Sequence, residues 1–194
     1  RKNRYPDSKN CQFKSINEQH TSLYSRYFCR DKTINVNGMN MNCTFEIKQL
    51  PERTVIYCRH QGALDQMQEA FANLMKWALP RGLVSHPDMK LLSVYHDDPR
   101  VTPVDKLTAD AAMFVEADIK PEGMIGCYKL TSGLYAVGRF ELVMNEFPAA
   151  WSAMFDLLEE NGCKCGHGHH YEIYQNNHDE HPEKKFIVDI CIPA

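Results

Sequence analysis

The chain has 194 residues, of which 43 % are hydrophobic, so it can bury a core of ordinary size as one domain or as two fused half-domains. Its 22 basic and 25 acidic residues give a net charge of -3, which excludes an overall basic surface for nucleic acid, so any DNA contact must come from elsewhere. No apolar run approaches the roughly 20 residues that span a bilayer, and no signal peptide is recognisable, so we expect a cytoplasmic protein without a membrane segment.

Residues 1–42 are polar and rich in Asn, Lys and Arg, a composition that predicts a linker or coupling arm. The chain opens with the basic string RKNR and without Met. We therefore expect a further domain before residue 1.

Regular patterning begins near residue 44. β-branched and aromatic residues predict strands at 44–49 and 54–60, and Pro51 and Glu52 between them predict a hairpin. A helix follows, because apolar residues recur every three or four positions up to Ala78, before Pro80 and Gly82.

Two further strands are expected near 90–96 and 111–119, joined by an exposed loop rich in Pro and Asp. The remaining chain repeats this order of elements. It predicts strands near 124–130 and 133–141, a helix near 147–161, and strands near 169–176 and 185–192.

Two copies of one pattern underlie this order. LPERTVIYCRHQG at 50–62 overlays LTSGLYAVGRFEL at 130–142, which sets Arg59 over Arg139, and the helical stretches set Phe71 over Trp151. Agreement of strand, turn and helix in order predicts a duplicated α+β fold with a cleft between its halves.

One carboxylate stands out in the strand HHYEIYQNN. A two-residue period places His170, Glu172 and Tyr174 on one face and Tyr171 with Ile173 on the other. Glu172 then lies either on an exposed strand face or in a cleft. Its counterpart in the first half is Ser93, so only one half carries an acid, an asymmetry that a ligand site would need.

Four strings resemble the GyrI-like small-molecule-binding domain, which occurs at the C-terminal end of AraC-type transcription regulators and also as a standalone protein. They are SVYHDDPRVTPVDKLTADAAMFV at 93–115, YKLTSGLYAVGRFEL at 128–142, FPAAWSAMFDLLEENG at 147–162 and YEIYQNN at 171–177. The resemblance covers residues 43–194. It implies an antiparallel α+β fold of two strand-helix-strand-strand modules, 43–120 and 121–194, related by a pseudo-twofold axis, with a ligand groove between them.

The resemblance also implies site residues. Glu172 matches the acid that faces the ligand, often a cationic, aromatic or lipophilic compound, and Trp151 matches the helix tryptophan of the family. Further candidates for the groove walls are Tyr174, Tyr135, Tyr95 and Phe155. Thr108 stands where the family usually has an arginine, so any charge role of that arginine is lost.

Cysteine and histidine gather in CKCGHGHH at 163–170, which offers soft and borderline ligands for zinc, nickel or copper. The spacing matches no standard zinc motif and the glycines suit a turn, so we expect neither a metal nor a cofactor. His60 and His96 have no pattern typical of a catalytic triad, and the common enzyme motifs are missing. The eight cysteines are expected to be reduced thiols.

The favoured hypothesis is therefore an effector-sensing domain of an AraC-type regulator that contacts DNA only through a helix-turn-helix domain before residue 1. The alternative is a hydrolase of electrophilic small molecules, with Glu172 as general base and Tyr135 or Tyr174 as proton donor. A domain that binds a protein partner is a third possibility, and the chain is compatible with a homodimer.

Overall fold

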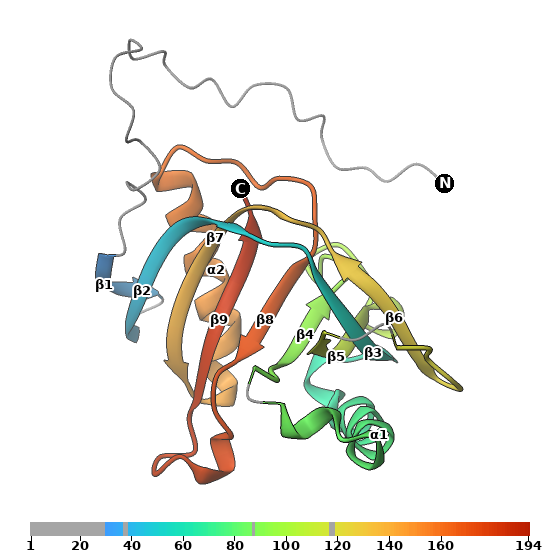
Figure 1. Cartoon of the computed structure of the whole chain (residues 1–194). Coiled ribbons are helices and arrows are strands. Elements are labelled where there is room, and N and C mark those ends of the chain that lie inside the picture. Colours follow the sequence, from blue (N-terminus) through green and yellow to red (C-terminus); the bar gives the residue numbers. More distant parts are fainter. Residues whose placement is uncertain (1–29, 37–38, 87, 117–118) are drawn as a thin grey trace.

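The computed structural model of the chain describes residues 30–36, 39–86, 88–116 and 119–194 (Figure 1). These residues form a 9-stranded antiparallel sheet and two α-helices, as the α+β expectation requires. The helices are α1 (Gln68–Ala78) and α2 (Phe147–Glu160). The strands are β1 (Arg30–Val36), β2 (Met39–Leu50), β3 (Arg53–Gln61), β4 (Leu91–Tyr95), β5 (Thr108–Val115), β6 (Ile125–Leu130), β7 (Gly133–Leu142), β8 (His170–Tyr174) and β9 (Phe186–Pro193).

The strand order is β1-β2-β7-β9-β8-β4-β5-β3-β6, so β8 and β4 pair inside the sheet (Figure 1). The register of this pair sets Ser93 directly opposite Glu172. The counterpart that the sequence suggested for Glu172 is therefore its neighbour in space.

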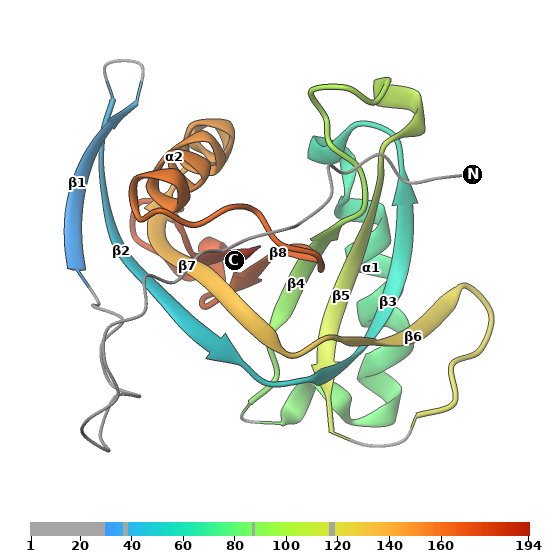
Figure 2. The same cartoon turned by 90° about the horizontal axis from the view of Figure 1, so that it is seen from above.

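The predicted hairpin of the strands at 44–49 and 54–60 is wrong. β2 pairs with β1 and β7, whereas β3 pairs with β5 and β6. The connection through Pro51 and Glu52 lacks the Gly or Asn that the common two-residue hairpin turns require. Each strand also buries its apolar side chains against a different helix, Phe45 of β2 with α2 and Ile56 of β3 with α1. The chain thus crosses from one half of the sheet to the other at this point, as Figure 2 shows.

Strand structure extends into the segment predicted as an arm. Residues 30–36 and 39–42 belong to β1 and β2, and Met41 is buried in the core beside α2. Asn40 and Asn42 alternate with buried Met41 and Cys43 as a strand requires, but Asn is depleted in strands, so the composition did not predict one. Residues 1–29 lie outside the described residues, and their role as a coupling arm stays a prediction.

A row of directly opposed residues crosses the sheet beneath both helices. In order it runs Cys58, Ala111, Ser93, Glu172, Ile190, Gly138, Phe45. Cys58 and Ala111 pack with α1, and Ile190 and Phe45 pack with α2. Since opposed residues share a face of the sheet, α1 and α2 cover the same face, and Glu172 lies between their two cores.

The two helices end and pack as their sequences predict. α1 buries Ala70, Leu74 and Ala78, and α2 buries a stripe that includes Met154 and Leu157. The opposite face of the sheet holds a third core cluster, which includes Val94, Tyr135 and Tyr171. The central strands are therefore packed on both faces, against the two helices on one face and within this third cluster on the other.

The absence of a side chain at Gly138 allows β7 to pack closely against α2. A Cβ atom there would lie 2.2 Å from Met154 Sδ and 2.8 Å from Phe140 Cε2. Gly138→Ala should therefore lower the free energy of unfolding by about 1–3 kcal/mol, measured by denaturant titration. Gly133→Ala in the same strand is the control, because its nearest contact is an ordinary 3.7 Å, and it should be close to neutral. Equal effects of the two variants would contradict the packing argument.

Candidate ligand site

Glu172 lies in the middle of β8 with only 1 % of its surface exposed. Its Oε1 accepts a hydrogen bond of 2.6 Å from the indole N–H of Trp151, and its Oε2 accepts one of 2.8 Å from the hydroxyl of Tyr174. The Tyr174 oxygen is 2.8 Å from Ser93 Oγ, which is therefore placed to donate to it. Glu172 is buried and held by named donors, so the interpretation as an exposed strand face is wrong.

Aromatic rings from both helices and both central strands surround this carboxylate. The rings of Tyr95 and Trp151 are perpendicular with centroids 5.5 Å apart, and Phe71 of α1 meets Tyr174 edge to face at 6.0 Å. Phe155, one turn after Trp151, has its ring 6.3 Å from that of Trp151. These side chains are only half-buried, so the aromatic surface above Glu172 reaches solvent.

The burial of Glu172 from water determines the electrostatics of the site. Burial raises the pKa of Glu172, and hydrogen bonds from Trp151, Tyr174 and Tyr95 offset part of that rise. Burial and the nearby carboxylate also raise the pKa of Tyr95 and Tyr174, so both hydroxyls keep their protons and act as donors. All the groups that stabilise the carboxylate are thus neutral, and none of them cancels its charge.

A family model of the GyrI-like small molecule binding domain matches residues 44–194. The chain belongs to this family. It is 30% identical over 138 residues to the DNA gyrase inhibitor of Escherichia coli (strain K12), an alignment that covers 69% of this chain and 86% of that relative.

Solved structures show the same fold at low identity. The C-terminal domain of EcmrR matches with a TM-score of 0.60 and 14% identity, over 78% of this chain and 96% of that domain. EcmrR in its DNA complex matches with a TM-score of 0.61 and 14% identity, over 78% of this chain and 57% of the EcmrR chain. A hydrolase encoded by lin2189 from Listeria innocua matches with a TM-score of 0.55 and 12% identity, over 77% of this chain and 90% of that chain.

This GyrI-like domain brings together five of the six residues selected from its sequence. Trp151, Tyr174 and Tyr95 hold the Glu172 carboxylate, and Phe155 lies beside Trp151. Tyr135 lies on the other face of the sheet with its ring 5.5 Å from that of Tyr171, because its neighbour Ala136 faces α2. It is 2 % exposed and is separated from Glu172 by the sheet.

Phe71 and Ser93 belong to the site but were not selected. Phe71 covers Tyr174 from α1, and Ser93 supports the hydroxyl of Tyr174 from β4. The repeat alignment carried a signal for each, since it sets Phe71 over Trp151 and Ser93 at the counterpart of Glu172.

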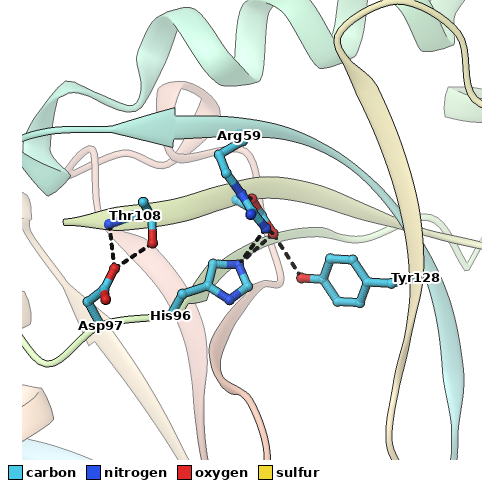
Figure 3. A network of polar contacts seen from close by, with 6 residues as sticks. Arg59, His96, Asp97, Thr108 and Tyr128 are labelled. Carbon is cyan, nitrogen blue, oxygen red and sulfur yellow. Dashed lines mark hydrogen bonds and ion pairs between the residues drawn. The ribbon is translucent and has the colours of Figure 1, made fainter. Parts of the chain in front are cut away.

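A separate polar network, drawn in Figure 3, lies on the opposite face of the sheet, because Arg59 and Asp110 each follow or precede a residue of the Glu172 face, Cys58 and Ala111. Asp110 is fully buried and accepts two hydrogen bonds from Arg59, of 2.7 Å and 2.9 Å. It also accepts one of 3.1 Å from the Tyr128 hydroxyl, and its Oδ2 lies 2.6 Å from His96 Nε2. His96 thus has a buried carboxylate as its hydrogen-bond partner. Thr108, where the family usually has an arginine, donates its backbone N–H and its hydroxyl to Asp97 (Figure 3).

One group of potential metal ligands lies away from Glu172, in the part of the chain that the structure describes. His86, Asp88 and Glu116 place ligand atoms within 4.8 Å of one another, and all three side chains are exposed. The Nδ1 of His86 already accepts a hydrogen bond of 3.2 Å from the Asp88 N–H, so its Nε2 carries the proton when the ring is neutral. This cluster is therefore an ordinary surface group rather than a prepared metal site.

Within the described ranges, none of the helices combines the length and the apolar character that crossing a membrane would need.

Proposed function

We propose that this domain binds a small lipophilic, aromatic or cationic effector above Glu172. The observation that carries the proposal is a carboxylate that is 1 % exposed and surrounded by aromatic rings, with only neutral hydrogen-bond donors. A poorly solvated negative charge gains more from a ligand cation than a hydrated one does. The rings offer the cation further attraction and offer an aromatic ligand a matching surface.

Access to the carboxylate requires a local rearrangement. The half-buried side chains Trp151 and Tyr95 meet edge to face over Glu172. A ligand cation can replace one of their hydrogen bonds once the rings turn aside. Binding is therefore expected to select an open arrangement of these two side chains.

The biological role we infer is that of a ligand sensor in an AraC-type transcription regulator. EcmrR, which shares this fold, forms a complex with DNA, and this supports a regulatory role here. Because the net charge of the chain is -3, the DNA contact is assigned to a helix-turn-helix domain outside it. Residues 1–29 would couple that domain to this one, and the ligand can shift regulation only by its differential affinity for the two states.

We further infer that the two halves arose by duplication. Arg59 of β3 lies opposite Asp110 of β5, and Arg139 of β7 lies opposite Asp189 of β9. Both pairs are bidentate, at 2.7 Å and 2.9 Å in the first half and at 2.6 Å and 2.8 Å in the second. The same ion pair at matched positions supports the repeat, and with it our proposal of a ligand site where the two halves meet.

The test compares two ligands of nearly the same shape. Benzyltrimethylammonium carries a positive nitrogen where neopentylbenzene has a neutral carbon, so the pair isolates the effect of charge. The cation should raise the melting temperature with increasing concentration and bind at least about tenfold more tightly by calorimetry. Equal affinity for both compounds, or no binding of the cation, would contradict the proposal.

Acid–base catalysis is a second candidate function, favoured by the chain of hydrogen bonds from Ser93 through Tyr174 to Glu172. The raised pKa of Glu172 suits a general base, and Tyr174 is a bonded proton donor, whereas Tyr135 lies across the sheet. The fold is shared with a hydrolase from Listeria innocua. Hydrolysis of an electrophilic ester or epoxide that Glu172→Ala abolishes would favour this function over simple sensing.

A further inference from the structure

Cys165 and His170 form a pair at the outer edge of the aromatic side chains. Cys165 lies exposed in the loop between α2 and β8, and its Sγ is 3.2 Å from Nε2 of His170. The His170 ring lies 6.4 Å from that of Trp151 and 6.1 Å from that of Phe155. A nucleophile and a base thus meet beside an aromatic surface, and neither takes part in holding Glu172.

Burial keeps both partners of the pair neutral at rest. Burial lowers the pKa of His170, and the nearby Asp98 carboxylate partly restores it, so the imidazole is unprotonated at neutral pH. Partial desolvation raises the pKa of the Cys165 thiol, while the Arg100 guanidinium lowers it. Since the imidazole is free to accept a proton at 3.2 Å, the thiol can be deprotonated as it reacts.

We propose that Cys165, with His170 as its base, captures aromatic Michael acceptors such as quinones and aryl enones as thioethers. Sγ forms a bond to the β-carbon, and the electron pair of the C=C bond moves to the carbonyl oxygen as an enolate. His170 Nε2 takes the thiol proton and returns it to the α-carbon. The reaction is an addition, so no oxidant or leaving group takes part.

The preference for aromatic compounds follows from what lies next to the thiol. Phe155 carries the Arg100 guanidinium over its ring at 5.3 Å, and Trp151 and Phe155 both contact the His170 side of the pair. An aryl group bound against these rings would hold its reactive carbon near Sγ. Positioning of this kind raises the effective concentration of the electrophile.

The experiment labels the whole chain with N-phenylmaleimide and, as a matched probe without the ring, N-ethylmaleimide. Peptide mapping by mass spectrometry gives a rate at Cys165 and at Cys163, a partly buried thiol in the same loop that serves as an internal reference. At pH 7 we expect Cys165 to react at least about tenfold faster than Cys163, with the larger ratio for the phenyl compound. Similar rates at both thiols would overturn the proposal.

Two measurements separate base catalysis from mere exposure. His170→Gln should slow labelling of Cys165 about tenfold or more and leave the rate at Cys163 as it was. In the unmodified chain, the rate at Cys165 should level off above about pH 7, because the ordinary pKa of 6.5 of His170 is lowered. A rate that keeps rising tenfold per pH unit toward pH 9 would overturn the proposal. Labelling needs no cation, so failure to bind benzyltrimethylammonium leaves this expectation standing.

Discussion

Glu172→Gln is expected to raise the melting temperature of the ligand-free domain at neutral pH and to weaken binding of benzyltrimethylammonium at least about tenfold. The side chain is 1 % exposed, and its charge meets only neutral donors, so the folded state bears the cost of desolvating it. Glutamine keeps the shape and one acceptor but removes the charge. We expect a gain of about 1 kcal/mol, or about 2–4 °C in melting temperature.

The gain in stability from Glu172→Gln should depend on pH. The pKa of Glu172 is raised in the folded state, so its stabilising contribution is complete below the ordinary value of 4.5 and is lost as the pH rises through the raised pKa. The advantage of Glu172→Gln should therefore shrink as the pH is lowered toward 4.5. Cation binding to the unmodified domain should weaken over the same interval, because protonation removes the charge.

Glu159→Gln is the matched control, since it makes the same chemical change at an exposed position of α2. Its melting temperature and its affinity for the cation should stay near those of the unmodified domain. A lower melting temperature together with unchanged affinity in Glu172→Gln would show that the carboxylate is a structural acceptor and not a ligand group.

Local patterns were sufficient to predict most elements of this fold. The spacing of Leu74 and Ala78 gives α1 its buried stripe, and Gly82, with a φ of 71°, ends the 3-10 turn of Leu79–Arg81 that follows α1. The period of two in β8 assigned Glu172 and Tyr174 to one face, and their shared hydrogen bond confirms it. These features depend on residues close together in the chain, which is why sequence alone carries them.

The pairing of strands that lie far apart in the chain could not be predicted from such local patterns. β2 and β3 are adjacent in sequence, yet they lie on opposite sides of the β8–β4 pair, because each buries its apolar side chains under a different helix. Tyr135 was selected as a groove residue for its aromatic ring, but the face it occupies depends on β7 packing Ala136 and Phe140 against α2. Which face a strand presents to a site is a property of the sheet as a whole.

Asp110→Ala should cause the largest loss of stability, about 3–5 kcal/mol, measured by denaturant titration. Asp110 has no exposed surface, and its two oxygens serve Arg59, His96 and Tyr128 together (Figure 3). Removing it leaves a guanidinium, an imidazole and a hydroxyl without their shared acceptor. Leaving these polar groups unpaired in a partly buried site lowers the stability by more than the lost hydrogen bonds had contributed.

Acid should narrow the difference in stability between Asp110→Ala and the unmodified domain. Burial alone would raise the pKa of Asp110, but hydrogen bonds and charge from His96 and Arg59 outweigh it, so the pKa lies below its ordinary value of 3.8. The stability that the lowered pKa contributes is present above pH 3.8 and is lost as the pH falls through the folded value. The gap in stability should therefore narrow only below about pH 4.

Asp189→Ala provides the control within the same chain, since Asp189 makes the matching ion pair with Arg139. Its other described side-chain partner is Gln175, whose amide donates to it at 2.9 Å, and the side chain of Asp189 is 8% exposed. With fewer donors left unpaired, Asp189→Ala should cost about 1–3 kcal/mol. An equal loss of stability in the two variants would contradict the role of Asp110 as a shared acceptor. Each aspartate would then contribute only through the ion pair that joins its two strands.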